Sequence, residues 1–489
     1  RIRPALPIIL IPSMHHHYPQ LFFCIAALCF WVAGYSAASG QDADNPRVTP
    51  TVQLVRKILP AVVSVRVQRP SKKPDVVEYG HGGGSVIHED GYILTNNHVV
   101  TNAKKIEIAF FQKEWIKVKL IARLPSEDLA LIKIDRDKPL TALPLGRSDD
   151  LELGEPVITI GSAGGLPHSL STGVISGLGR ATNTEHAHLA SMVQTSAPIS
   201  GGSSGGALIN AVGQQIGVIT SRKADGENLG FAITVDRVRE VFPRLLHTEE
   251  RFGIIHGIEV DPLYDAGAKI VAVAKDSPAS SAQLQVGDVI CTIDDRSIRS
   301  GVDFQISFID CKAGDSLALG VKRGDEELDI KLKLQAAPML TPVKTEGLKP
   351  GLRVQRYAGE WKQLPDFAAL TPEETYISDK SPATLADPAR DYYAELYTGF
   401  IRIPADDLYT FAIRSDDGSR LRLGERIVAN NDGWHSEQEV AGTIRLAQGD
   451  HPLRIEYFDA TGDQMLRVSI EDANGRKREL PADWLFHAP

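Results

Sequence analysis

The sequence predicts a multidomain protein built mainly of β-structure, and three observations support this fold class. The chain has 489 residues, which at roughly 150 residues per domain suggests about three domains. Short apolar runs separated by turn signals recur through most of the chain, as in β-sandwiches and barrels. Helices do not alternate regularly with these runs, which argues against a parallel α/β sheet.

Residues 1–40 differ in kind from the rest. Leu21–Tyr35 is an almost unbroken apolar run, and small residues follow it. This pattern predicts a signal peptide and an exported protein, either periplasmic or secreted. An uncleaved membrane anchor is the alternative, although the run is short for a hydrocarbon core of about 30 Å.

The composition is that of an ordinary globular protein, with 43% apolar residues, 24% charged residues and a net charge of −9. The sequence contains no long basic run, which argues against nucleic acid as a partner. Two of the four cysteines, Cys291 and Cys311, follow the predicted signal peptide. They either pair in an oxidising compartment or stay separate thiols.

The first folded region is predicted over residues 50–246. It opens with the apolar spacing of a short helix at Thr51–Leu59, which Pro60 interrupts. Brief β-rich runs follow, with a turn signal at Asp90-Gly91. A sandwich or barrel is expected here.

Two further domains are predicted beyond this region. Residues 251–336 combine strand-like runs with a helical stretch at Val302–Ile309, which indicates a small α+β domain. Residues 337–349 contain Pro, Gly and Lys without periodicity and are expected to form a linker. Alternating strands resume over residues 350–487, and a second all-β sandwich is the simplest interpretation.

Three polar residues of the first region lie beside apolar strands. His98 follows YILTNN, Asp128 precedes LALIK, and Ser204 lies within GGSSGG. Each alone has an ordinary explanation, as a packed histidine, a turn residue or a loop serine. Together they match a catalytic triad, in which an imidazole takes the serine proton and a carboxylate fixes the imidazole tautomer. The N–H groups of Gly202 and Ser204 are the expected oxyanion donors.

The segment Gly202–Gly206 also fits the G-x-S-x-G elbow of α/β-hydrolases. Such an elbow leads into a helix, whereas Ala207–Ile219 has the pattern of strand, turn and strand. The elbow interpretation is therefore rejected.

The segments GYILTNNHVV, DLALIKI and QTSAPISGGSSGGAL, with their spacing, resemble trypsin-like serine proteases of the HtrA (Deg) type over about residues 50–336. The resemblance implies a double β-barrel and an ATP-independent serine endopeptidase that cleaves unfolded or damaged proteins. It further implies no cofactor for catalysis, and homo-oligomers based on trimers. Ser203 and Ala207 depart from the family's usual Asn and Pro. The resemblance also implies that Gln194–Ser203 and Arg222–Asn228 line a small apolar specificity pocket.

Residues 251–336 resemble a PDZ domain, through DSPA at Asp276–Ala279 and GDVI at Gly287–Ile290. Such domains add a peptide strand to a sheet edge and hold its terminal carboxylate with backbone N–H groups. A purely scaffolding domain is the alternative. His256 departs from the usual apolar residue of the carboxylate loop. The candidate loop, which would take C-terminal peptides, consists of Ile255, His256, Gly257 and Ile258.

Residues 350–487 resemble the β-sandwich domain named after protective antigen, through FAIRSDDGSRL and GDHPLRIEYF. The resemblance suggests glycans as partners, bound through calcium held by adjacent Asp residues. Oxygen ligands suit calcium, so Asp416 and Asp417 with Asn431 or Asp432 are candidate ligands. A simple Asp-Asp-Gly turn is the alternative.

These observations together predict an exported serine endopeptidase that recognises unfolded polypeptides and C-terminal peptides. The alternative is a catalytically silent chaperone or adhesion protein, which would use the PDZ-like and sandwich domains as binding modules.

Overall fold

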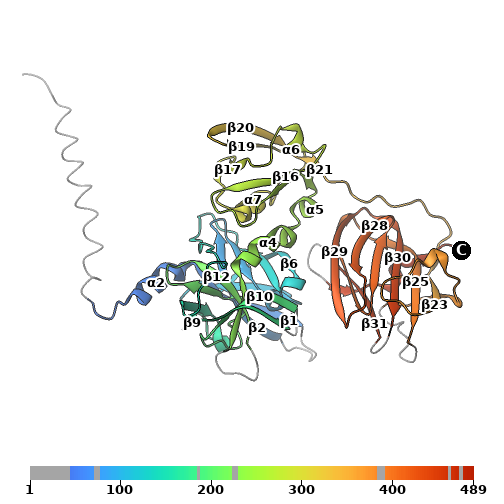
Figure 1. The fold of residues 1–489 in the computed structure, drawn as a ribbon, viewed down its shortest axis with the longest axis horizontal. Coiled ribbons are helices and arrows are strands. Elements are labelled where there is room, and N and C mark those ends of the chain that lie inside the picture. The colour runs from blue at the N-terminus through green and yellow to red at the C-terminus, as the bar shows by residue number, and fades with distance from the viewer. Residues whose placement is uncertain are drawn as a thin grey trace, which may run out of the picture. The chain divides into compact units, whose positions relative to one another are not determined.

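The computed structural model describes residues 45–70, 77–183, 188–222, 229–382, 391–460, 464–472 and 477–489 (Figure 1). The predicted signal peptide and residues 223–228 of the expected specificity pocket lie outside the described residues. Within the described part, no helix is both long and apolar enough to cross a bilayer. The expected helix at Thr51–Leu59 is present as α2 (Pro50–Ile58).

The first half of residues 50–246 is a seven-stranded antiparallel sheet. Its strands are β1 (Val62–Pro70), β2 (Val77–His88), β3 (Tyr92–Thr95), β4 (Lys105–Ala109), β5 (Ile116–Lys117), β6 (Lys119–Leu124) and β7 (Leu129–Lys133). They pair in the order β5-β4-β1-β2-β3-β7-β6. Because only Val118 separates β5 from β6 along the chain, the sheet curls until its two edges approach. The predicted turn at Asp90-Gly91 joins β2 to β3.

The second half is a closed antiparallel barrel of six strands. They are β8 (Pro156–Gly161), β9 (Ser169–Asn183), β10 (His188–Thr195), β11 (Ala207–Asn210), β12 (Gln215–Arg222) and β13 (Gly230–Thr234). The ring runs β10-β13-β12-β11-β8-β9 and closes between β9 and β10. Strand β11, and not a helix, follows the glycine-rich serine segment, so the rejection of the hydrolase elbow is confirmed. Helix α4 (Val235–Leu246) then begins at Thr234, whose side chain caps it.

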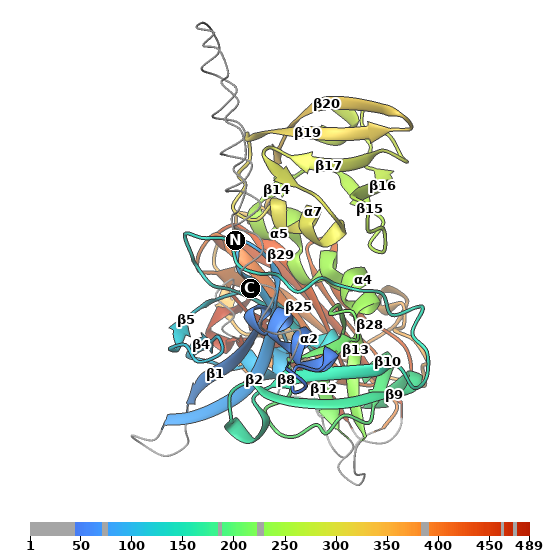
Figure 2. The same cartoon turned by 90° about the vertical axis from the view of Figure 1, so that its left-hand side faces the viewer.

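The α+β domain contains a sheet with β15 (Ile258–Val260), β16 (Ala268–Val273), β17 (Val289–Ile293), β19 (Ser316–Arg323) and β20 (Glu326–Lys333). Figure 2 shows these strands in the order β20, β19, β17, β16, β15. The two-residue strand β18 (Arg296–Ser297) pairs with β17, and β14 (Ile254–Ile255) pairs with β21 (Gln335–Ala336). The helices are α5 (Thr248–Phe252), α6 (Pro278–Ser281) and α7 (Gly301–Ser307). The helical stretch predicted near Val302–Ile309 is thus confirmed.

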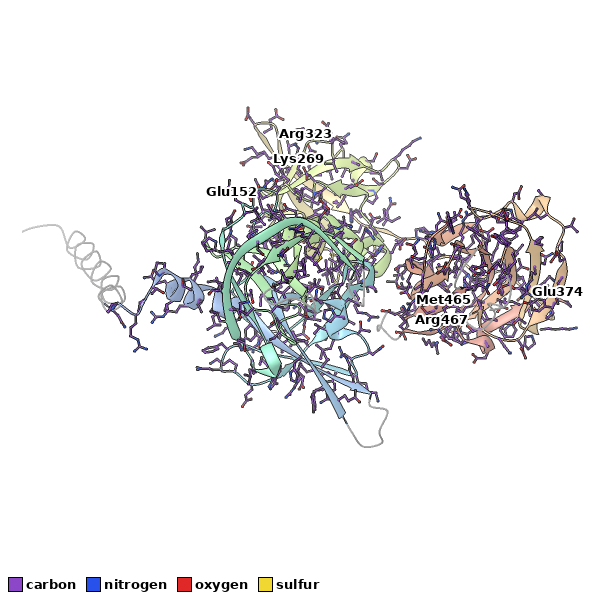
Figure 3. All side chains as sticks on the ribbon, turned by 60° about the horizontal axis from the view of Figure 1, so that its bottom comes forward. Glu152, Lys269, Arg323, Glu374, Met465 and Arg467 are labelled. Atoms are coloured by element: carbon purple, nitrogen blue, oxygen red, sulfur yellow. The ribbon has the colours of Figure 1, made fainter. Side chains whose placement is uncertain are left out.

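Strand β15 lies at the edge of this sheet, since β16 is its partner among the described strands. At the other side of the domain, the Arg323 guanidinium binds both oxygens of the buried Asp288 carboxylate, at 2.7 and 2.8 Å. Arg323 and Lys269 mark this domain in Figure 3. The charge pair and its hydrogen bond to Gln285 N hold the pKa of Asp288 below its ordinary value. Asp288 of the GDVI motif therefore stabilises the domain by binding Arg323 of β19 and the backbone at Gln285.

The C-terminal region is a β-sandwich, as predicted. The larger sheet contains β22 (Lys349–Pro350), β23 (Leu352–Ala358), β24 (Glu374–Ser378), β25 (Tyr393–Ile403), β27 (Ser419–Leu423), β28 (Arg426–Asn431), β30 (Gly449–Asp459) and β33 (Leu485–His487). The smaller sheet contains β26 (Asp407–Asp416), β29 (Gln438–Leu446), β31 (Met465–Glu471) and β32 (Lys477–Glu479). In Figure 3, Met465 and Arg467 mark β31 and Glu374 marks β24. Inward-facing aliphatic and aromatic side chains of both sheets form one core.

The expected linker at residues 337–349 has little regular structure, but it is bonded to the sandwich. Leu340 exchanges backbone hydrogen bonds with Arg445 and Ala447, and Val343 N–H donates to Asp450 O at 2.9 Å. These bonds tie the segment to the ends of β29 and β30.

The two cysteines of the α+β domain are both free thiols. The Cys291 thiol contacts Val289 O at 3.6 Å, and the Cys311 thiol contacts Ser307 O at 3.4 Å. Burial raises the pKa of Cys311, which makes its thiol less reactive.

Candidate active site

Asp128 is fully buried between the short helix η2 (Pro125–Glu127) and β7. Its carboxylate accepts three hydrogen bonds: from His98 N at 3.0 Å, from His98 Nδ1 at 2.8 Å, and from the Thr220 hydroxyl at 2.6 Å. Because the carboxylate can only accept at these contacts, the His98 proton lies on Nδ1 and Nε2 is left as the basic nitrogen. This is the tautomer that a general base requires.

His98 lies on the short helix α3 (Asn97–Val100), directly after β3. The guanidinium of Arg69, from β1, donates to the carbonyls of His98 and Val99 at 2.8 and 2.9 Å. A helix this short has few hydrogen bonds of its own, so these contacts satisfy carbonyls that it leaves free. The backbone of His98 is thereby fixed at its N–H by Asp128 and at its carbonyl by Arg69.

Ser204 lies in the loop between β10 and β11, and its hydroxyl donates to the carbonyl of Thr220 at 3.1 Å. Thr220 is a residue of β12 whose own hydroxyl binds Asp128. Thr220 thus contacts Ser204 through its backbone and Asp128 through its side chain. The structure brings the three predicted triad residues into one site, with the carboxylate–imidazole pair in direct contact.

Glycines let the serine loop press against the strands beside His98. A Cβ on Gly205 would lie 2.3 Å from Thr95 Oγ1, and one on Gly82 would lie 2.7 Å from Val99 and 2.9 Å from Ser204 O. Gly83 N–H also donates to Ser204 O at 2.7 Å. Side chains larger than hydrogen at these positions would force the two halves of the site apart.

The predicted oxyanion donors are available. No acceptor among the described residues takes the N–H of Gly202 or that of Ser204. The carbonyls of Gly201 and Gly202 accept from Gly164 N and Ser162 N, at 2.7 and 3.0 Å. These bonds fix the loop while its two N–H groups stay available for a ligand.

Three protein-family models match the chain. The trypsin-like peptidase domain matches residues 82–218, the PDZ domain matches residues 255–334, and the PA14 domain matches residues 348–484. A probable periplasmic serine endoprotease DegP-like of Pseudomonas fluorescens is 32% identical over 62% of this chain and 73% of its own length. The chain belongs to the HtrA family of serine proteases.

Two further sequence relatives agree with this assignment. The periplasmic pH-dependent serine endoprotease DegQ of Escherichia coli is 29% identical over 62% of this chain and 75% of its own length. Serine protease HTRA1 of Xenopus tropicalis is 33% identical over 60% of this chain and 68% of its own. A solved HtrA-type protease, AlgW with tripeptide, is 29% identical over 59% of this chain and 98% of its own, with a TM-score of 0.37.

This HtrA-family chain is therefore a serine protease with a PDZ domain and a C-terminal PA14 β-sandwich, as predicted. Catalysis in this family needs no cofactor. The catalytically silent alternative loses support, because the matched relatives are named endoproteases.

The candidate carboxylate loop of the PDZ domain joins β14 to β15. Gly257 has a φ of +74°, and a Cβ there would lie 2.2 Å from the Cβ of Ser277. The carbonyls of His256 and Gly257 accept from Ala279 N and Ala274 N, at 3.0 and 2.9 Å. The DSPA segment therefore holds one side of the loop.

His256 does not face a ligand from within this loop. Its buried ring stacks on Phe308 at 4.4 Å between centroids, and its Nδ1 accepts the N–H of Ile258 at 3.0 Å. Desolvation lowers the pKa of His256 to about 4, and the Glu249 carboxylate opposes this only in part. The ring is neutral at physiological pH and serves the loop as a hydrogen-bond acceptor.

The candidate calcium ligands Asp417 and Asp432 bind different neighbouring groups of the protein. Asp417 accepts from His435 N and Ala460 N at 3.1 and 2.9 Å, and Asp432 is bound to Leu364 N and the Arg420 guanidinium. In the described residues, no group of three or more His, Cys, Asp or Glu side chains is arranged to hold a metal ion.

Oxygens without hydrogen-bond partners do lie close to these residues. Asn431 Oδ1 and both carboxylate oxygens of the fully buried Asp459 find no partner in the described part of the chain. Burial raises the pKa of Asp459 to about 7, and the nearby Asp417, Asp391 and Asp416 add to the rise. The sequence analysis missed Asp459, because nothing in YFDA marks a strand residue as an uncompensated buried acid.

The outer face of the larger sandwich sheet carries a cavity of about 500 Å³. Glu456 in its lining is 5% exposed, and its Oε1 accepts from Arg454 Nε at 2.8 Å. Oε2 has no hydrogen-bond partner in the described residues, and it forms ion pairs with Arg420 Nη1 at 3.5 Å and Arg422 Nε at 3.9 Å. Phe367 and the guanidiniums of Arg420, Arg422 and Arg454 line the same cavity.

Thr220 and Arg69 are functional-site residues that sequence reasoning missed. A threonine inside an apolar strand and an arginine before a proline have no distinguishing pattern. Glu127 was missed as well: next to Asp128, it binds the Arg237 guanidinium of α4 at 2.6 and 3.0 Å. Each of these contacts joins segments that are distant along the chain, so spacing gives no signal.

Proposed function

We propose that His98, Asp128 and Ser204 are the catalytic triad of this protease. The observation that carries the proposal is the buried Asp128 carboxylate, which binds both the backbone N–H and the Nδ1–H of His98. The Ser204 proton, directed to Thr220 O in this structure, would turn to His98 Nε2 as Oγ attacks the peptide carbonyl. His98 would then pass that proton to the leaving amine.

The N–H groups of Gly202 and Ser204 would hold the oxyanion of the tetrahedral intermediate. Their lack of acceptors in the described residues supports this role. Donors that are fixed before the reaction lower the barrier because they need no reorganisation as charge develops.

The triad is tested with the Ser204→Ala variant in a casein-cleavage assay. We expect kcat/KM to fall by about four to six orders of magnitude. Ser281→Ala, which removes an exposed hydroxyl of α6, is the matched control and should keep full turnover. Wild-type protein of confirmed fold that neither cleaves casein nor reacts with a serine-directed phosphonate would overturn the assignment.

We infer that the substrates are unfolded or damaged proteins of the cell envelope, cleaved without ATP after small apolar residues. Relatives named periplasmic endoproteases and the apolar run at Leu21–Tyr35 support the envelope location. Mass-spectrometric mapping of the cut sites in unfolded and native forms of one protein tests both points. Equal cleavage of the two forms would contradict the inference.

Export to the periplasm is the proposed location, with the leader either removed or retained as an anchor. N-terminal sequencing of protein recovered from fractionated cells distinguishes the two, since a removed leader leaves a new terminus near residue 40. We propose a homo-oligomer based on trimers, which light scattering of the purified protein tests. A monomer would contradict it.

The loop of Ile255, His256, Gly257 and Ile258 is the proposed site for the free carboxylate of a peptide C-terminus. Two features support it: the N–H groups of His256 and Gly257 converge on one carboxylate oxygen, that of Glu249, and the adjacent β15 is an edge strand. Binding of a peptide with a free C-terminus, and loss of binding when that terminus is amidated, is the expected result.

A second binding function is proposed for the PA14 domain, whose cavity would take a sugar. Glu456 Oε2 would accept from a ligand hydroxyl, and the Arg422 guanidinium would donate to a ligand oxygen. A glycan array with the wild type and Arg422→Ala, both in EDTA, tests this cavity. Equal binding by the two proteins would exclude it.

Calcium is a separate proposal for the same domain, with Asp416, Asp417, Asn431 and Asp459 as ligands. The oxygens of Asp459 and Asn431 that lack partners support it, whereas Asp432 is excluded by its ion pair with Arg420. Calcium would draw these oxygens together and neutralise the buried acid. A thermal shift with calcium that Asp459→Asn abolishes is expected; no shift would exclude the site.

A further inference from the structure

The carboxylate loop of the PDZ domain already holds a carboxylate. Glu249 Oε1 accepts the N–H of His256 at 2.8 Å and the N–H of Gly257 at 2.7 Å. The next N–H of the loop, that of Ile258, is taken by the His256 ring. All three N–H groups that a peptide terminus would use are therefore engaged within the domain.

The backbone of the loop orients these donors toward Glu249. On the opposite side, the carbonyls of His256 and Gly257 are bonded to Ala279 N and Ala274 N. With its carbonyls fixed there, and with Gly257 in the left-handed region, the loop presents its N–H groups together as a small anion site. One carboxylate oxygen placed between two such N–H groups makes the contact that a peptide's terminal oxygen would make.

Glu249 reaches the loop from α5, the five-residue helix that precedes β14. The Thr248 hydroxyl binds Gln305 Oε1 of α7 at 2.5 Å, which positions the start of α5 on the body of the domain. Gly253, with a φ of +68°, ends the helix and returns the chain into β14. The side chain is about one-third exposed, so it can swing into solvent without disturbing the core.

We propose that Glu249 is a built-in competitor of the peptide carboxylate, so that the PDZ site of the free protein is self-capped. The proposal rests on the proposed peptide-binding role of Ile255–Ile258. Two carboxylates cannot share the same two N–H groups, because each N–H has one proton to donate and the anions repel. A C-terminal peptide binds only after the Glu249 carboxylate has left.

Self-capping makes the affinity for a peptide depend on the fraction of molecules with an open loop. Helix α5 follows α4 of the protease domain after His247 alone. The residue that a peptide displaces thus lies in the segment that joins the protease and PDZ domains. The ligand class is a polypeptide with a free α-carboxylate, and an internal segment without that group is excluded.

The experiment compares the full chain carrying Ser204→Ala, which prevents cleavage of the probe, with the same chain carrying Glu249→Ala in addition. The probe is a fluorescein-labelled ten-residue peptide ending in valine, with either a free or an amidated terminus, and anisotropy reports binding. Removing the competitor should tighten binding of the free acid on the order of tenfold. The amidated peptide should bind weakly to both proteins.

Two further variants isolate the cause. Glu249→Gln keeps an oxygen acceptor without the charge and should give an intermediate affinity. Glu326→Ala removes the same charge from the exposed end of β20 and should leave the affinity unchanged. Thermal unfolding of each variant confirms that the domain is folded.

Two results would overturn the proposal in different ways. Equal affinity of the two proteins for the free-acid peptide would show that Glu249 does not compete, while the loop would still be a carboxylate site. No difference between the acid and amide peptides in any variant would remove the loop's carboxylate role itself. Neither result bears on the proposed catalytic triad, which is tested separately by casein cleavage with Ser204 intact.

Discussion

The serine loop around Gly202 and the PDZ loop around Gly257 share a tightly packed glycine in the left-handed region. They differ in whether their backbone N–H groups already have acceptors. In the serine loop, Gly202 has a φ of +94° and a Cβ there would lie 2.0 Å from Ser162 O. In the PDZ loop, Gly257 has a φ of +74° and a Cβ would lie 2.2 Å from Ser277 Cβ. The first loop leaves the N–H groups of Gly202 and Ser204 without acceptors in the described residues. In the second loop, Glu249 and the His256 ring accept from the corresponding N–H groups.

The difference teaches that a cluster of N–H groups is not enough to define a binding site. The backbone conformation brings the N–H groups together. Whether these groups are available to a ligand depends on the side chains of the neighbouring element. In the active site, the side chains of His98 and Asp128 bind one another. In the PDZ domain, helix α5 ends beside the loop of Gly257 and carries the Glu249 carboxylate.

Of the changes that compare the two loops, Gly202→Ala in the serine loop should have the largest effect. The new methyl group clashes with Ser162 O and the left-handed backbone strains it, so the donor moves and kcat/KM should fall about 10²- to 10³-fold. Gly154→Ala is the matched control, since Gly154 has the same φ of +94° and open space around it. Casein kinetics measure both. Similar losses in the two variants would mean that strain, and not the donor, matters.

At the capped loop, Gly257→Ala should destabilise the PDZ domain by about 2 to 3 kcal/mol, through the clash with Ser277. Hydrogen exchange over residues 254–336 measures this locally. Gly324→Ala, in an open turn with a φ of +60°, should cost less. Unchanged hydrogen exchange in Gly257→Ala would contradict the comparison of the two loops, because it would show that the PDZ loop tolerates a side chain at position 257.

The neutral His256 ring makes the capped loop sensitive to acid. Its folded pKa of about 4 lies below the ordinary 6.5, so the unfolded chain binds the proton more tightly. This stability is fully present above about pH 6.5 and is lost as the pH falls toward 4, with about 2 kcal/mol lost at pH 5. Hydrogen exchange of the PDZ domain from pH 7 to pH 4.5, corrected for intrinsic rates, measures the loss.

His256→Phe provides the control for this acid sensitivity. It keeps a ring against Phe308 but has no group that titrates, so the dependence on pH should flatten while stability at pH 7 falls. An equal slope in both proteins would assign the acid sensitivity to another group.

The smallest effect is expected from Thr220→Val, which removes the hydroxyl that binds Asp128 but keeps the carbonyl that receives Ser204. We expect kcat/KM to fall about tenfold, because one of three donors to the carboxylate is lost. The pH profile of kcat/KM should also shift, and Thr220→Ser should restore it. Loss of activity without a change in the profile would indicate a merely structural role.

Several elements could be predicted because their signal is local. The strand pattern with the turn at Asp90-Gly91, the helix at Pro50–Ile58 and the three segments around His98, Asp128 and Ser204 combine distinctive residue types at short range. Periodicity and turn chemistry act over a few residues, so they can be recognised without coordinates. The free state of Cys291 and Cys311 could not be predicted, because pairing depends on the distance between strand β17 and the segment that follows α7.

Sequence alone was sufficient for the domain classes, and it named a candidate triad and a candidate PDZ loop, since each depends on residue types in a fixed local order. Only the tertiary structure decided that Thr220 bridges Ser204 and Asp128, that Asp459 is a buried acid without a partner, and that Glu249 fills the PDZ loop. The physical reason is that a hydrogen bond depends on distance and direction to within a few tenths of an ångström. Ordinary residues such as a strand threonine or a helix glutamate acquire a role only when folding places an acceptor or donor in front of them.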